Sequence, residues 1–70
     1  MVEKSIELTG ASANSIEDAV SIALARAAVT IDSIRHVHVE DISATVENGA
    51  VAYWRVRIRI TFAVQDRLHE

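Results

Sequence analysis

The sequence lacks the residues that several classes of protein require. It has no cysteine, which excludes disulfide bonds and thiolate zinc sites. Aromatic residues make up only 4%, so platforms that stack single-stranded nucleic acid are missing. The net charge of −3 also argues against a general nucleic-acid binder. With no signal-peptide pattern and no run of roughly 18 apolar residues, we expect a cytoplasmic protein without membrane contact.

The chain is short for the amount of apolar surface that it carries. Its 70 residues predict a single domain over 1–70, and such a chain buries only about 60% of its unfolded surface. Proteins below roughly 70–80 residues usually recruit disulfides, a metal or partner subunits. Because half of the residues are apolar and cysteine is absent, we expect self-association to bury the surplus.

Residues 50–64 show the clearest pattern in the chain, a strict alternation of two side-chain classes. One side is apolar and carries Ala52, Trp54, Val56, Ile58, Ile60, Phe62 and Val64. The other side carries three arginines, Arg55, Arg57 and Arg59. A period of two over so many positions predicts a strand with one buried face and one solvated face. We expect it to be the central strand of an antiparallel sheet, with Trp54 in the core.

The remaining elements are also predicted from periodicity and turn signals. Residues 2–8 alternate and predict a strand that ends at Thr9-Gly10. A helix capped by Asn14 or Ser15 is expected to run to about Ile31, because apolar residues recur at three- and four-residue spacing. These are Ile16, Ala19, Val20, Ala23, Ala27 and Ile31.

Residues 34–46 predict a further strand, whose apolar phase slips near Glu40-Asp41 and so indicates a bulge. Asn48-Gly49 then predicts a tight hairpin into the central strand. The fold is therefore α+β, with element order β-α-β-β. A three-stranded antiparallel sheet of order 1-3-2 is expected to pack on one helix. The polar tail, residues 65–70, is expected to be loose, with His69 in solvent.

Histidines and acids offer candidate metal ligands. His36 and His38 lie two apart in a strand and so point the same way, which would suit a metal. A third ligand would come from Asp41, Glu40 or a symmetry mate, but we favour polar-face histidines without a ligand. Glu40, Asp41, Glu47 and Asn48 supply oxygen atoms that would suit calcium or magnesium, although no spacing resembles an EF-hand.

The arginine row has two interpretations. The arginines would grip a phosphate or carboxylate, or form a salt-bridge ladder with Glu3, Glu7 and Glu40. We favour the ladder for Arg57 and Arg59 and leave Arg55 open between the two. Tyr53, on the same face, is an interface residue or a stacking group. With no paired nucleophile and base, phosphate-binding glycine loop or carboxylate pair, we expect no enzymatic activity.

Several stretches taken together point to a family. They are Ile6-Glu7-Leu8-Thr9-Gly10, Ser12, Ile16-Glu17-Asp18-Ala19, Ala25-Arg26-Ala27, Val39, Asn48-Gly49-Ala50-Val51-Ala52, Tyr53-Trp54-Arg55-Val56 and Phe62. The chain resembles the dodecins over nearly its whole length without a gap. Dodecins are small β-α-β-β proteins that assemble as hollow dodecamers. Typical members bind flavins in pairs between tryptophans of two subunits across a twofold axis, while a glutamine reads the polar edge of the ring.

The resemblance implies a non-catalytic homododecameric shell that stores or sequesters a small molecule. The tryptophan position corresponds to His36 and the glutamine position to Arg55, and with Tyr53 these residues are expected to line the pocket. We expect FMN, FAD or riboflavin, or a related anionic ligand, to bind weakly, because each lost stacking contact removes on the order of 1 kcal/mol. Members without the tryptophan have been linked to calcium. The alternative is therefore an assembly without flavin that binds a cation such as calcium, or is purely structural.

Overall fold

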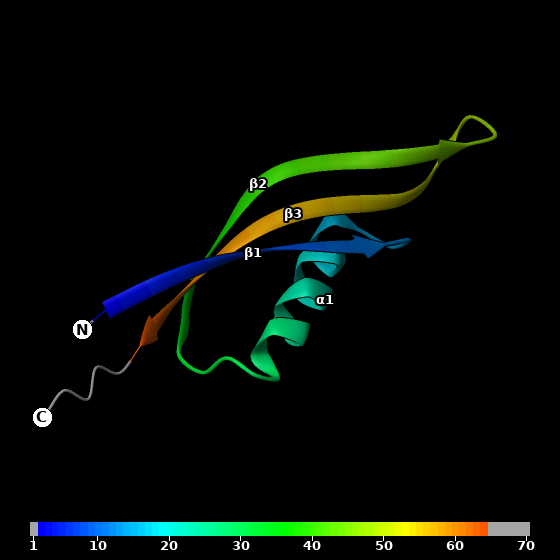
Figure 1. Ribbon diagram of the computed structural model, residues 1–70. Coiled ribbons are helices and arrows are strands. Elements are labelled where there is room, and N and C mark those ends of the chain that lie inside the picture. Colours follow the sequence, from blue (N-terminus) through cyan, green and yellow to red (C-terminus); the bar gives the residue numbers. More distant parts are fainter. Residues whose placement is uncertain (1, 65–70) are drawn as a thin grey trace, which may run out of the picture.

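The computed structural model describes residues 2–64, which form four elements. These are β1 (Val2–Ser12), α1 (Ile16–Ala28), β2 (Ile34–Glu47) and β3 (Ala50–Val64). Both neighbours of β3 are antiparallel to it and the sheet order is β1-β3-β2, with α1 on one face (Figure 1). The predicted fold class and topology are confirmed. The expected loose tail, including His69, lies outside the described residues.

The helix begins where its capping residue predicts and ends earlier than its apolar periodicity predicts. The Ser15 side chain accepts a hydrogen bond from the backbone N–H of Asp18 at 2.9 Å, which satisfies one of the free amides of the first turn. The helix ends at Ala28 and not near Ile31. Ser33 has a φ of 60°, and this left-handed residue turns the chain into β2. The three- and four-residue spacing of apolar residues therefore continues past Ala28 into a turn, so it overestimates the length of the helix.

The first strand is longer than predicted, because Thr9-Gly10 does not end it. Gly10 is buried beneath α1 and pairs with Val56 of β3. A Cβ at position 10 would lie 2.3 Å from the carbonyl oxygen of Ala19. The glycine is thus a point of close backbone approach between strand and helix.

The core is small and lies only where α1 covers the sheet. Its fully buried members are Ala19, Ala23, Ala27, Val56, Ile58 and Ile60. Thirteen helical residues extend about 20 Å, whereas the fifteen residues of β3 extend about 50 Å. Trp54, predicted to be in the core, is therefore only half-buried. It lies opposite Ser12 and Ala44, near the end of the helix-covered region.

The β2–β3 hairpin extends beyond α1 as a ribbon (Figure 1), and we call its residues 42–54 the hairpin arm. Its turn is the predicted one, since Asn48 and Gly49 have φ values of 54° and 77°, as a two-residue hairpin loop requires. A register shift between Val39 and Asp41 confirms the predicted bulge. Two further shifts, between Ile34 and His36 and at Thr45/Val46, were not predicted.

Candidate functional site

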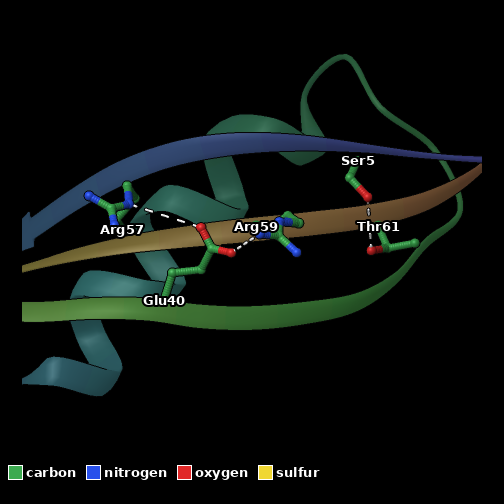
Figure 2. Close-up of polar contacts among 5 residues, drawn as sticks. All are labelled: Ser5, Glu40, Arg57, Arg59 and Thr61. Atoms are coloured by element: carbon green, nitrogen blue, oxygen red, sulfur yellow. Dashed lines mark hydrogen bonds and ion pairs between the residues drawn. The ribbon is translucent and has the colours of Figure 1, made fainter.

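The side of the sheet away from α1 carries the three arginines of β3, and we call it the polar face. Glu40 of β2 lies between two of them (Figure 2). Its Oε1 atom is 4.0 Å from the Nε atom of Arg57, and its Oε2 atom contacts the guanidinium of Arg59. The bulge at Glu40 positions this carboxylate between two arginines two residues apart. The predicted ladder is confirmed for Arg57 and Arg59 with Glu40 as the acid.

The two other acids proposed for the ladder differ in position. Glu7 lies opposite Arg59 and shares a side-chain hydrogen bond with Glu40. That bond, together with the negative charge of Glu40, raises the pKa of Glu7. The same bond, with the nearby arginines, lowers the pKa of Glu40. Glu3 lies opposite Ala63, two rows beyond the arginines. Of the three acids proposed for the ladder, Glu7 and Glu40 therefore lie beside the arginines and Glu3 does not.

Arg55 differs from the other two arginines, because no acid forms an ion pair with it among residues 2–64. Its guanidinium carbon lies 6.0 Å from the centre of the Tyr53 ring, within range of a cation–π contact. Hydrogen bonds from the Thr45 hydroxyl and from Arg55 lower the pKa of Tyr53. Thr45 faces Tyr53 across the hairpin. Tyr53 of the hairpin arm and Arg55, which follows the arm in β3, thus lie side by side on the polar face.

The third predicted ligand contact, His36, lies far from this pair. His36 is exposed and faces Thr61, whereas Arg55 faces Ser43. Thr61 and Arg55 are six residues apart in β3, which corresponds to about 20 Å. The single chain therefore brings together Tyr53 and Arg55 but not His36. A pocket containing all three would have to combine two copies of the chain.

The residues predicted to hold a cation are placed as follows. Glu40 is engaged by Arg57 and Arg59, and its neighbour Asp41 lies opposite Arg57. Within the described part of the chain, no group of three or more acids or histidines is arranged to hold a metal ion. The two guanidinium groups beside Glu40 would repel a metal cation at that position. A cation site with Asp41 would therefore need ligands from another copy.

Comparison with protein-family models gives a match to the model described as Dodecin, over residues 2–65. The chain belongs to the dodecin family. Its element order and sheet order are those expected of a dodecin, as the solved structures below confirm. No curated protein sequence matches it significantly. Among residues 2–64 the structure contains no helical segment with the length and hydropathy of a membrane span.

Solved dodecin structures match the chain over almost its full length. An arginine-to-alanine variant of the T. thermophilus dodecin has 32% identity and a TM-score of 0.89, with 94% of this chain and 97% of that chain covered. The dodecin from Streptomyces coelicolor has 26% identity and a TM-score of 0.87, with 94% of each chain covered. The calcium dodecin of Mycobacterium tuberculosis, described as having a novel calcium-binding site, has 27% identity, a TM-score of 0.80 and full coverage of both chains.

Sequence reasoning missed two contacts of this dodecin's polar face. The contact between Glu7 and Glu40 joins the two edge strands across β3, and no pattern within either strand indicates it. The pairing of Thr45 with Tyr53 depends on the shift at Thr45/Val46. A regular two-residue hairpin would have placed Thr45 opposite Ala52. The alternation of 50–64 correctly placed both Tyr53 and Arg55 on one face.

Proposed function

We propose that this dodecin forms a homododecameric shell that stores or sequesters a flavin, or a related aromatic anion, without catalysis. The proposed site combines Tyr53 and Arg55 of one copy with His36 of another. The observation that carries the proposal is the arrangement of the polar face. An arginine without an acid partner among residues 2–64 lies beside an aromatic ring, and the second aromatic group is exposed about 20 Å away. Two copies are needed to complete such a site.

The shape of the chain supports assembly. Its radius of gyration is 15.1 Å, against about 11 Å for a compact chain of this length. Large apolar side chains remain exposed on the helix, directly after it and along the strands, with Val29 82% and Val46 61% accessible. The others are Val2, Ile22, Val39, Ile42 and Val51. Contact with further copies is the simplest way to bury them. The number twelve is taken from the family.

The chemistry of the three residues suits a flat ligand that carries negative charge. The Tyr53 ring and the His36 imidazole are planar groups that stack on an aromatic system. Arg55 can donate to the carbonyl oxygens of an isoalloxazine ring or to a phosphate tail. Imidazole covers less area than indole, so the affinity is expected to be lower than at a tryptophan pair.

Two measurements test the proposal. Light scattering should give one species near twelve times the 7.7 kDa chain. Titration of riboflavin, FMN and FAD with protein should quench flavin fluorescence, and Arg55→Gln should weaken quenching by FMN and FAD more than by riboflavin if the arginine binds phosphate. Arg26→Gln, an exposed change on α1, is the matched control. A monomer, or no quenching of any flavin at high micromolar protein, would refute the proposal.

A second candidate function is cation binding by an assembly that holds no flavin. The full-length similarity to the calcium dodecin favours testing it. Asp41 and Glu47 of β2 are exposed acids that could meet their counterparts from another copy. A rise in melting temperature with calcium or magnesium that is lost in Asp41→Asn would support this function. The absence of both the cation response and flavin quenching would leave a purely structural particle.

A further inference from the structure

The two histidines of β2 form a pair on the polar face. His36 lies opposite Thr61 and His38 lies opposite Arg59, so both strands advance by two residues between them. The two imidazoles therefore point to the same side of the sheet. Both residues are exposed, and β2 is an edge strand with one open side. Within residues 2–64, both side chains are therefore open to a dissolved ion.

The spacing of the pair suits one metal ion. Residues two apart in a strand are separated by roughly 7 Å. Each imidazole reaches several ångströms from its Cα atom and binds a metal at about 2.0–2.1 Å. Two rings on the same face can therefore converge on an ion placed between them. This arrangement differs from the acid cluster at Glu40, which the arginines occupy.

The charged group nearest the pair is a guanidinium that has a carboxylate partner. Arg59, the cross-strand neighbour of His38, is paired with Glu40, which Arg57 shares, and Glu7 lies on the other side of Arg59. Opposite His36, the Thr61 hydroxyl is 3.4 Å from that of Ser5 (Figure 2). The groups facing the pair are thus a hydroxyl pair and a guanidinium that already has its carboxylate.

We propose that His36 and His38 bind a late first-row divalent cation, of which zinc, nickel and copper are the candidates. Neutral imidazole is a preferred ligand of these ions. Residues 2–64 contain no third ligand arranged with the pair, so the remaining positions are filled by water or by the same pair of a second copy. This site is separate from the proposed cation site at Asp41, which would use oxygen ligands, and it shares only His36 with the proposed flavin site.

Isothermal titration of the full chain with zinc and with nickel tests this site. We expect one ion per chain if water completes the coordination, or one per two chains if two copies share it. His38→Gln should weaken binding at least tenfold, roughly the lower end of the losses that even outer-shell changes cause. His69→Gln, which alters the remaining histidine of the sequence, should leave binding unchanged. Unaltered binding in His38→Gln, or its loss in His69→Gln, would overturn the proposal.

The same variants separate this site from the flavin site. His38→Gln should lose metal and keep flavin quenching, whereas Arg55→Gln should weaken quenching by FMN and keep metal. Circular dichroism establishes that each variant is folded, which is expected because both side chains are exposed. Equal loss of metal binding in folded His38→Gln and folded Arg55→Gln would show that the histidines are not specific ligands and would refute the site.

Discussion

Gly10 of β1 and Ala19 of α1 lie closer together than they could if any residue other than glycine stood at position 10. A Cβ built on Gly10 would lie 2.3 Å from the carbonyl oxygen of Ala19, and 2.9 Å from the Cβ of Ala23. The nearer atom belongs to helical backbone, which cannot rotate away as a flexible side chain would. This contact sets the distance between helix and sheet, and with it the small alanine-lined core.

Gly10→Ala should therefore destabilise the protein by about 1–3 kcal/mol, the usual cost of overpacking a well-packed site. Urea denaturation followed by circular dichroism, at one fixed protein concentration because assembly adds to stability, measures the change. Ala11→Ser, at the exposed neighbouring position of β1, is the control and should change little. Equal stability of Gly10→Ala and wild type would show that the helix can shift outward freely.

The fold could be predicted because the signals that define it are local. The alternation of 50–64 and the Asn48-Gly49 turn fixed the central hairpin, and the phase slip placed the bulge at Glu40. The errors arose where a contact between distant elements decides the outcome. Gly10 is a residue type that is typical of turns, but here it allows close contact between strand and helix. Trp54 lies on the apolar side of the alternation, at a position that the helix is too short to cover.

The candidate site could be predicted only in part for a related reason. Alternation places Tyr53 and Arg55 on one face, and the acids near Arg57 and Arg59 suggest their pairing. Which acid is paired depends on the bulge, which brings Glu40 between both arginines. The position of His36 relative to Arg55 depends on strand register, and the subunit that would supply it depends on surface contacts between copies. Neither is encoded in a single strand's pattern.

Glu7 and Glu40 should respond to pH in opposite directions. The raised pKa of Glu7 means that its ionisation costs stability as pH rises through the folded-state value. The lowered pKa of Glu40 means that its ion pairs stabilise the fold above an unfolded value of about 4.3 and are lost as pH falls through the folded one. Glu7→Gln should therefore raise the melting temperature at pH 7, and the advantage should vanish near pH 4.

Thermal melts between pH 4 and pH 8 measure this effect. Glu3→Gln is the matched control, because it removes the same charge from the same strand opposite Ala63. It should not reproduce the pH-dependent gain. A Glu7→Gln variant that melts below wild type at pH 7 would mean that the attraction of Arg57 and Arg59 for ionised Glu7 outweighs its repulsion from Glu40.

Assembly should depend on the apolar side chains of the hairpin arm. Ile42 lies opposite Val56 on the edge strand and is 48% exposed, although its neighbour in the sheet is fully buried. Ile42→Lys would place a charge in any interface formed there, so smaller species should dominate in light scattering. Ser21→Lys, on the exposed side of α1, should leave the size unchanged. Full-size particles of Ile42→Lys would remove this part of the arm from the interface.

His36→Trp should strengthen flavin binding. An indole ring covers more of a flavin than an imidazole does, and each added stacking contact contributes on the order of 1 kcal/mol. A site shared by two copies contains residue 36 of each copy, so the gain applies twice. The affinity should therefore increase by about tenfold or more. Fluorescence titration with FMN measures it.

His38→Trp is the control for that gain, since it places the same ring two residues along the polar face, opposite Arg59. It adds aromatic area without changing the proposed pocket. Stronger quenching in both variants would indicate nonspecific stacking on the sheet surface. A gain confined to His36→Trp would locate the ligand at position 36. Arg55 lies about 20 Å from that position in the same chain. Loss of the gain on adding Arg55→Gln would therefore show that two copies build the site.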